Sequence, residues 1–348
     1  MTRPDPDAVP TILTVTANPS LDRTLELPAP LHRGGVQRAT AVRAEPGGKG
    51  VNVARVVTEA GLHARALLPA RTGDPLLTAL DAVALPYVAL STNSDVRSNI
   101  TVVDPDGTTT KLNVPGVPFD ADGARRFLEL IVAGAAGTRW VALCGSLPPG
   151  LPDTWYRTVI DELAGQGCRV AVDTSGAPLS ATMNGHADLL KPNEEELAEA
   201  TGLDPAPLVA ATARGDHAPV AAAARTLAER TGATVLVTLG AAGAMLITEA
   251  GAWFATPPPI VPRSTVGAGD AALAGYLIAE SRGDTEPERL RTAVAYGSAA
   301  TALAGTQPPT PEHLDRRGVH VVDLTPDGPR SRATPPTNPI TPPPIHRR

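Results

Sequence analysis

A short glycine-rich stretch, Ser264-Thr265-Val266-Gly267-Ala268-Gly269-Asp270, is followed at once by an alanine-rich run at 271–276. Small residues suit a turn that opens directly into a helix, whose first backbone N–H groups have no intrahelical partner and can hold an anion. The carboxylate of Asp270 could there accept a proton from an alcohol. The amides of Gly267, Ala268 and Gly269 would meanwhile stabilise charge on a transferring phosphoryl group. The alternative is that Asp270 only caps the helix.

Aliphatic strand-like runs alternate with helix-like stretches along the chain. The predicted strands lie at 11–17, 64–69, 140–144, 169–173, 189–190, 234–238 and 244–248. The predicted helices lie at 50–60, 121–135, 153–164, 194–200, 220–230 and 286–303. This alternation predicts an α/β fold with a mostly parallel, doubly wound sheet covered by helices on both faces. Ligands of such sheets lie beyond the carboxyl ends of the strands, where the polar candidate residues of this chain also fall.

Two segments, about 23–44 and 97–113, interrupt the alternation. Asp104-Pro105-Asp106-Gly107 is a strong hairpin turn signal between two short strand-like runs. We therefore expect a small sheet outside the main one. Because such a sheet is only marginally stable alone, dimerisation through it has a physical reason.

The length of 348 residues suits one large α/β domain, which we place at 11–323. Residues 1–10 are expected to be disordered. The proline-rich residues 324–348 have too few apolar side chains to pack and predict a disordered tail. Residues 204–219, which also contain proline, are predicted to form a loop.

Composition excludes several classes of function. The net charge is −6 with both signs mixed along the chain, so no nucleic-acid footprint is expected. No apolar run reaches the length of a membrane span, and the first residues resemble no signal peptide, which predicts a soluble cytoplasmic protein. Cys144 and Cys168 lack the spacing of a metal site and are expected to be buried free thiols in a reducing compartment. The seven histidines are scattered, and none joins a motif.

Several motifs in a fixed order resemble the signature regions of the PfkB (ribokinase-like) sugar kinases, over roughly residues 11 to 315. The two leading ones are Thr16-Ala17-Asn18-Pro19-Ser20-Leu21-Asp22 and Glu45-Pro46-Gly47-Gly48-Lys49-Gly50-Val51-Asn52-Val53-Ala54-Arg55, and the Gly-Ala-Gly-Asp segment is the third. The resemblance implies a three-layer α/β/α fold with a small β-lid over the sugar. It also implies a homodimer through the lid. Ala271 stands where the family often has Ser, away from the expected chemistry.

The resemblance also implies an acceptor site in the first half of the chain. Its residues would be Asp22, Gly48, Lys49, Asn52, Arg97, Asn99 and Ser146. Gly47-Gly48-Lys49-Gly50 lacks the spacing of a nucleotide P-loop, so Lys49 is expected to meet a sugar or its phosphate. Asp22 would accept bonds from sugar hydroxyls, and Arg97 would clamp a phosphate. The alternatives are that the glycines at 47–50 only form a turn, that Asp22 is a surface residue of a turn and that the side chain of Arg97 is solvated.

A nucleotide site is implied in the second half. Its residues would be Ser175, Lys191, Asn193, Thr238, Leu239, Gly240, Ala241, Ala242, Gly243 and Gly269. The resemblance further implies a magnesium ion near Asn193 and Glu196, held through water. The same two residues also fit a helix capping box, and the glycines fit a tight turn.

Together these residues lead us to expect ATP-dependent phosphorylation of a ketohexose phosphate, with Asp270 as the general base. By resemblance, the favoured reaction converts fructose 1-phosphate to fructose 1,6-bisphosphate. Tagatose 6-phosphate and fructose 6-phosphate remain open as acceptors. A sugar-phosphate-binding regulator without catalysis is the remaining alternative, which the intact Gly-Ala-Gly-Asp segment disfavours because a binder needs no base.

Overall fold

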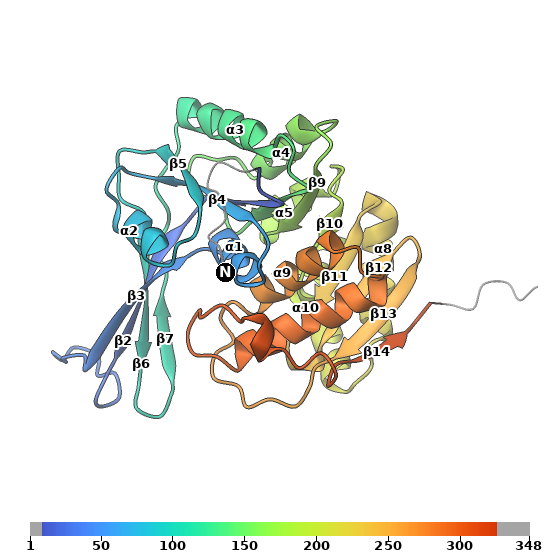
Figure 1. Ribbon diagram of the computed structural model, residues 1–348. Coiled ribbons are helices and arrows are strands. Elements are labelled where there is room, and N and C mark those ends of the chain that lie inside the picture. Colours follow the sequence, from blue (N-terminus) through green and yellow to red (C-terminus); the bar gives the residue numbers. More distant parts are fainter. Residues whose placement is uncertain (1–8, 326–348) are drawn as a thin grey trace, which may run out of the picture.

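A ten-stranded sheet runs through the part of the chain that the structure, a computed structural model, describes, residues 9–325 (Figure 1). Its strand order is β14-β13-β12-β11-β10-β9-β8-β1-β4-β5. The strands are β1 (Ile12–Thr16), β4 (Ala64–Ala70), β5 (Tyr87–Ser91), β8 (Trp140–Cys144), β9 (Arg169–Asp173), β10 (Leu189–Leu190), β11 (Thr234–Thr238), β12 (Ala244–Thr248), β13 (Gly251–Thr256) and β14 (His320–Asp323). From β5 to β11 the neighbours are parallel, whereas β12, β13 and β14 follow as antiparallel strands.

Helices cover both faces of this sheet, which gives the three layers that the sequence predicts (Figure 1). They are α1 (Lys49–Glu59), α2 (Pro75–Ala82), α3 (Ala121–Ala135), α4 (Trp155–Leu163), α5 (Gly176–Thr182), α6 (Glu194–Thr201), α7 (Pro205–Ala213), α8 (Ala218–Thr231), α9 (Ala268–Ser281) and α10 (Glu286–Thr301). Side chains of α1, α2, α9 and α10 share one hydrophobic core, and those of α3 to α8 share the other.

The central strands β1 and β8 are buried on both faces. In β1, Ile12 packs into the core of α1 and α9, whereas Leu13 and Val15 pack into the opposite core. A strand that meets helices on both sides must be apolar at successive positions, which explains the continuous aliphatic runs. Because β1 lies between β4 and β8, the strand order reverses there, and ligands of doubly wound sheets bind beyond such a point.

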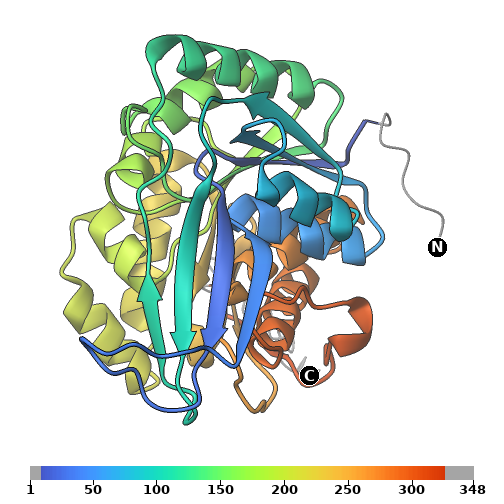
Figure 2. The ribbon, with the colours of Figure 1, turned by 90° about the vertical axis from the view of Figure 1, so that its left-hand side faces the viewer.

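A second, four-stranded sheet projects from the body, and we call it the lid. Its strand order is β3 (Ala41–Gly47), β2 (Ser20–Glu26), β6 (Arg97–Val103) and β7 (Thr109–Leu112). Figure 2 shows this sheet face-on, in front of the body. The middle strands β2 and β6 are parallel and set Asp22 opposite Asn99. The lid begins three residues before the predicted segment, and residues 27–40 form an irregular loop inside it.

The structure corrects the loop predicted at 204–219. The segment forms α7 and the start of α8, because Asp204 caps α7 through the N–H of Ala206 and Pro205 occupies the first helical position. Proline is tolerated there since that N–H has no helical partner. Cys168 is also only partly buried, whereas Cys144 is fully buried, and both are free thiols.

The last described residues bond to the edge of the main sheet. Leu324 donates its N–H to the carbonyl of Ala252 at 2.7 Å, and Thr325 Oγ1 accepts from the N–H of Ala252. The predicted tail boundary at 324 therefore falls within a hydrogen-bonded segment. The rest of the predicted tail and residues 1–8 lie outside the described residues. Among residues 9–325, no helix is long and apolar enough to cross a membrane.

Candidate active site

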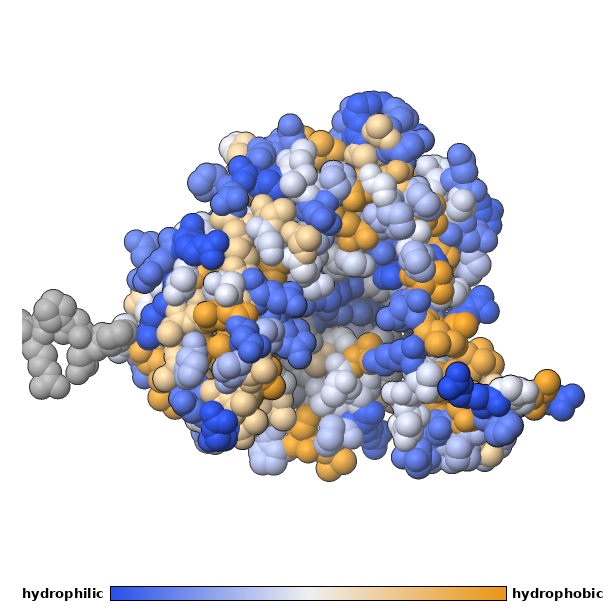
Figure 3. Space-filling view, turned by 180° about the vertical axis from the view of Figure 1, so that it is seen from behind, coloured by the Kyte–Doolittle hydropathy of each residue, from blue (hydrophilic) through white to orange (hydrophobic). Residues whose placement is uncertain are grey.

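A cavity of about 1460 Å³ lies between the lid and the carboxyl ends of the main strands. Figure 3 shows the molecule hollowed beside the lid, with hydrophilic side chains inside. Residues from both halves of the chain line it: Asp22, Gly48, Lys49, Asn52, Arg97 and Asn99 on the acceptor side, and Lys191, Asn193, Glu196, Thr238, Gly240, Ala241, Ala242, Gly243, Gly267, Ala268, Gly269 and Asp270 on the other. Most of the predicted site residues are thus brought together around one space.

Asp270 lies in the first turn of α9 and is 7% exposed. The N-cap of α9 is Gly267, in the left-handed conformation with φ +78°, so Asp270 is not the helix cap. Instead, its Oδ2 accepts a hydrogen bond from Asn52 Nδ2 at 2.8 Å, across 218 residues of sequence. Burial, together with the nearby carboxylate of Asp173, raises the pKa of Asp270 to about 6. Lys49, the Asn52 amide and Lys191 oppose that rise.

The start of α9 offers backbone donors beside this carboxylate. The first bond of the helix runs from the N–H of Ala271 to the carbonyl of Gly267 at 2.8 Å. The N–H groups of Gly269 and Asp270 therefore precede the helical ladder and face out of the helix end, whereas that of Ala268 makes a long bond of 3.5 Å to the carbonyl of Thr265. The amide of Asp270 thus joins the predicted set. Lys191 Nζ lies 3.5 Å from the position that a Cβ on Gly269 would take, so an ammonium stands at the same helix end.

Next to Asp270, an ion cluster joins the end of β9, the start of α1 and the segment after β10. Asp173, at the end of β9, is fully buried; its Oδ1 accepts from Lys49 Nζ at 2.7 Å, and its Oδ2 lies 3.2 Å from Lys191 Nζ. Burial alone would raise the pKa of Asp173, but the two ammonium groups hold it below its usual value. Burial would likewise lower the pKa of Lys49, and the carboxylates of Asp173 and Asp270 outweigh it and raise that pKa. Asp173 and Lys49 are therefore both charged.

Lys49 lines the cavity, as the sequence predicts for a residue that meets the acceptor, and its ammonium is also paired with Asp173. Asp173 itself was missing from the predicted site. Its signal in the sequence is a carboxylate at the last position of a buried strand, directly before Thr174 and Ser175. A polar residue in that place is costly unless it is paired.

On the lid, Asp22 is the centre of the acceptor side. Its Oδ1 accepts from Ser20 Oγ at 2.7 Å and from Asn99 Nδ2 at 3.0 Å. Arg97 donates through one terminal nitrogen to the carbonyl of Asn18 and through the other to that of Val114, each at 3.1 Å. Burial lowers the pKa of Arg97, and the charge of Asp22 partly offsets this.

The glycines before α1 allow this arrangement. A Cβ on Gly47 would stand 2.3 Å from Asp22 Oδ2, so the backbone of β3 approaches the carboxylate as closely as a glycine permits. Gly48 has φ +110° and faces Thr16, whose Cγ2 would lie 2.7 Å from an added Cβ. Other residues would strain this conformation and displace the neighbours.

On the nucleotide side, Asn193 and Glu196 form the capping box of α6. Asn193 Oδ1 accepts from the N–H of Glu196 at 2.8 Å, and Glu196 Oε2 accepts from the N–H of Asn193 at 2.9 Å. The capping alternative is thus real, and both side chains also line the cavity. A bridge between Asn193 and Thr238 brings α6 beside the Gly240–Ala242 turn. Sequence reasoning missed the apolar wall of the cavity, which follows β13 at residues 257–260 and includes Val294 of α10.

Three predicted residues do not line the cavity. Ser146 accepts a hydrogen bond from Asn18 Nδ2 at 3.2 Å and so braces the loop before β2. Ser175 is the N-cap of α5. Leu239 is 3% exposed and packs into the core, as an apolar side chain between two buried strands must.

The donors present suit a magnesium ion that keeps most of its water. Among the described residues, no three His, Cys, Asp or Glu side chains gather into a metal cage. Asn193 Oδ1 and the carboxylate of Glu196 each accept one backbone bond and retain lone pairs toward the cavity. Magnesium is commonly held by one or two carboxylates plus substrate phosphates, so these residues fit it.

Comparison with known proteins gives a consistent result. The sequence model of the pfkB family carbohydrate kinases matches residues 16–313. The chain is 36% identical to the 1-phosphofructokinase of Rhodobacter capsulatus, over 87% of this chain and 94% of that protein. It is 33% identical to the ATP-dependent 6-phosphofructokinase isozyme 2 of Escherichia coli, over 85% and 94%. The crystal structure of phosphofructokinase-2 from Escherichia coli in complex with substrates and products has a TM-score of 0.79 and 32% identity, covering 87% of this chain and 96% of that one.

Proposed function

Because the chain belongs to the pfkB family of carbohydrate kinases, we propose that its acceptor is a ketohexose phosphate and that the favoured reaction converts fructose 1-phosphate to fructose 1,6-bisphosphate. ATP is the co-substrate that this family implies. One observation carries the proposal. A buried carboxylate with a raised pKa, Asp270, shares the end of α9 with unpaired amides and an ammonium, directly opposite the polar face of the lid.

Asp270 is the general base of this proposal. With a pKa of about 6, its carboxylate is largely ionised at pH 7 yet basic enough to take a proton from a sugar hydroxyl in the transition state. The bond from Asn52 occupies Oδ2, which leaves Oδ1 for that hydroxyl. The oxygen of the hydroxyl then forms a bond to the γ-phosphorus of ATP as the bond to the β-phosphate oxygen breaks.

The N-terminal end of α9 and the ammonium group of Lys191 bind the transferring phosphoryl group. The predicted amides of Gly267, Ala268 and Gly269, joined by that of Asp270, would bind the phosphoryl oxygens over which negative charge is spread. Asp173 orients the ammonium of Lys191 and also holds Lys49. These donors are fixed before the substrate arrives, so little reorganisation is needed during the reaction.

Magnesium completes the nucleotide site in this proposal. When bound, it neutralises charge on the phosphate oxygens. Asn193 and Glu196 would hold its water shell from the first turn of α6, where the two side chains are already fixed by their capping bonds.

The lid binds the acceptor. Asp22 and Asn99 present a carboxylate and an amide to sugar hydroxyls. The guanidinium of Arg97 has a buried Nε–H without an acceptor among the described residues, and we assign it to the phosphate already on the sugar. A phosphorylated acceptor satisfies this charge, whereas a free sugar would leave it desolvated.

The choice among ketohexose phosphates follows the likeness to the 1-phosphofructokinase of Rhodobacter capsulatus. An assay of ADP release with fructose 1-phosphate, fructose 6-phosphate, tagatose 6-phosphate and free fructose tests it. We expect the highest kcat/KM with fructose 1-phosphate. Faster turnover of fructose 6-phosphate or tagatose 6-phosphate would show that this sugar phosphate, and not fructose 1-phosphate, is the preferred acceptor. Absence of turnover with every sugar phosphate would overturn the proposal.

We also propose a homodimer that forms through the lid. The face of the lid turned away from Asp22 carries Arg23 and Thr110 beside five apolar side chains, of which Val42 is 62% and Leu112 is 55% exposed; the five are Leu25, Val42, Ile100, Val102 and Leu112. Exposed apolar side chains gathered on one sheet face suit a second copy of the chain. Sedimentation should give a dimer for the wild type and a monomer for Val42→Asp with Leu112→Asp; a monomeric wild type would contradict the dimer.

The reaction is assigned to the cytoplasm. The two free cysteines support this assignment, because free thiols are typical of reducing compartments.

A further inference from the structure

Asp74 is a fully buried carboxylate that lies outside the cavity. It stands between β4 and α2, and its Oδ1 accepts a hydrogen bond from the N–H of Leu76 at 2.8 Å, which caps α2. Its Oδ2 accepts a second bond, also 2.8 Å, from the N–H of Val96. Capping needs only the first of these bonds, since Asn or Ser would cap the helix equally well. The second bond therefore calls for a separate explanation.

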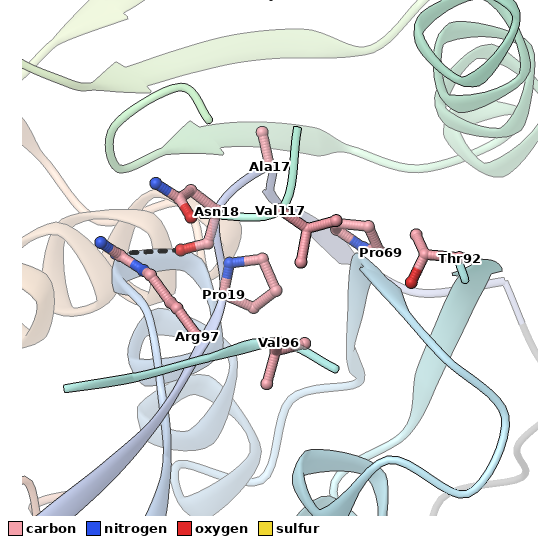
Figure 4. Close-up of a pocket in the computed structure, with 8 residues that line it drawn as sticks. All are labelled: Ala17, Asn18, Pro19, Pro69, Thr92, Val96, Arg97 and Val117. Atoms are coloured by element: carbon pink, nitrogen blue, oxygen red, sulfur yellow. Dashed lines mark hydrogen bonds between the residues drawn. The ribbon is translucent and has the colours of Figure 1, made fainter. Parts of the chain in front are cut away.

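Val96 directly precedes Arg97, the first residue of β6, and lies where that strand leaves the body to enter the lid. The side chain of Arg97 reaches back over the same junction to the carbonyls of Asn18 and Val114. Figure 4 shows Val96 next to Arg97 and the bond from the guanidinium to Asn18. Arg97 is thus held at two points. Its guanidinium donates to two backbone carbonyls, and Asp74 accepts from the N–H of the preceding residue, Val96.

Packing alone leaves Val96 some freedom. A small void of about 10 Å³ lies beside it, lined by residues of the segments that join the lid to the body (Figure 4). These are Ala17, Asn18, Pro19, Pro69, Thr92, Val96, Arg97 and Val117. Since apolar contacts are not directional and are incomplete here, the bond to Asp74 is the directional constraint on the N–H of Val96, one residue before Arg97 pairs with Ser20 of β2.

We propose that Asp74 is a positioning residue for the acceptor: it fixes the backbone before Arg97 and thereby sets where the guanidinium meets the acceptor phosphate. This inference rests on the proposed function, in which Arg97 binds that phosphate. Asp74 does not touch the substrate, and its effect passes through Arg97. Small displacements of a positioned group weaken binding strongly, because the geometry of the complex is lost.

Two variants separate this role from helix capping. Asp74→Asn and Asp74→Ser both keep a cap for Leu76, but neither offers Val96 the second carboxylate oxygen. We expect the KM for fructose 1-phosphate to rise about tenfold in both, while kcat and the KM for ATP change less than twofold. If Asp74→Asn does not fold, the smaller Asp74→Ser, which places no N–H against that of Val96, carries the test.

Asp204 offers a matched control. It also precedes a proline and caps its helix through the N–H of the second residue after it. Within residues 9–325, its side chain accepts no second backbone hydrogen bond like the one from Val96 to Asp74. Asp204→Asn should leave the KM for fructose 1-phosphate unchanged. Circular dichroism and the melting temperature of each variant show whether loss of stability accounts for any change in KM.

A double-mutant cycle decides whether the effect passes through Arg97. In an Arg97→Ala background, Asp74→Asn should change the KM for fructose 1-phosphate less than twofold, because the guanidinium that Asp74 positions is gone. Independent effects that multiply in the double variant would overturn the inference, as would an unchanged KM in the single Asp74 variants. A wild type inactive on every sugar phosphate would instead overturn the proposed function, so the two failures are distinguishable.

Discussion

At the scale of single residues, Asp173 and Asp270 show how two buried carboxylates acquire different proton affinities. Asp173 touches two ammonium groups, which hold its pKa below the usual value. Asp270 is buried and stands near the charge of Asp173, and among the described residues its one side-chain hydrogen-bond partner is an amide, so its pKa rises to about 6. The first is suited to hold cations, and the second is suited to take a proton.

Replacement of the base tests this assignment. Asp270→Asn keeps the side-chain shape but cannot accept the proton, so kcat should fall by ~10²–10⁴-fold with the KM for ATP largely retained. Steady-state kinetics on fructose 1-phosphate measures both. Asp284→Asn, just beyond the far end of the same helix, is the control and should be active. Near-normal turnover of the Asp270 variant would show that the carboxylate is not the base.

The pH profile should report the same group. The base works only when ionised, so kcat/KM should decrease as pH falls through about 6. The Asn52 amide stabilises the charged form, and its removal in Asn52→Ala should raise the pKa of Asp270 and move the acid limb to higher pH. Profiles of both enzymes from pH 5 to 9 check this. An acid limb that does not move would mean that another group titrates.

At the scale of elements, the lid depends on strand β3 passing very close to β2. Gly47 in β3 leaves room for the carboxylate of Asp22, and the next residue turns the chain into α1. The position of the acceptor carboxylate is therefore fixed by the absence of a side chain on the neighbouring strand.

An added methyl group should disturb only the acceptor side. In Gly47→Ala, the Cβ would collide with Asp22, so the KM for fructose 1-phosphate should rise at least tenfold while that for ATP stays within twofold. Gly34→Ala is the control: it strains the lid loop at φ +80° but meets no atom within 4 Å. It should lower the melting temperature without changing either KM. Equal effects of the two variants would show that general lid stability, not Asp22, governs acceptor binding.

Local patterns in the sequence predicted the elements better than the contacts between them. The aliphatic runs of β1 and β8 and the turn at 104–107 are local signals, and each element formed as expected. The helix α7 was missed because prolines suit both a loop and a first helical turn. The role of Asp173 needed the convergence of β9, α1 and the segment after β10, which only the packed sheet reveals.

At the scale of the whole molecule, a second buried charge cluster lies at the opposite end of the strands. Glu280 of α9 is 2% exposed and accepts bonds from Arg139, Arg169 and the indole N–H of Trp140. Burial would raise its pKa, but these donors outweigh burial and lower the pKa to about 2. One helix thus carries the proposed base, Asp270, at its first turn and an anchoring carboxylate, Glu280, in its last turn.

The lowered pKa of Glu280 makes the free energy of unfolding depend on pH. A carboxyl group whose pKa is lower in the folded than in the unfolded protein stabilises the fold when the pH is above the pKa of the unfolded state, which is near 4.5 for Glu280. This contribution is lost as the pH falls toward the pKa of the folded state, about 2. Glu280→Gln should therefore cost about 3 kcal/mol at pH 7 and less at pH 3. Urea unfolding at both pH values measures it, with the exposed Glu229→Gln as control. A cost that is independent of pH would show that packing, not charge, is responsible.

The parallel pairing of β2 with β6 has a consequence for the order in which the chain folds. Asp22 and Asn99 are 77 residues apart, and β3, α1, β4, α2 and β5 lie between them in the chain. Closing a long loop costs chain entropy that only the completed intervening unit offsets, so the acceptor site should assemble late. During refolding from urea, far-UV circular dichroism should recover before enzymatic activity does. Simultaneous recovery would mean that the lid forms together with the body.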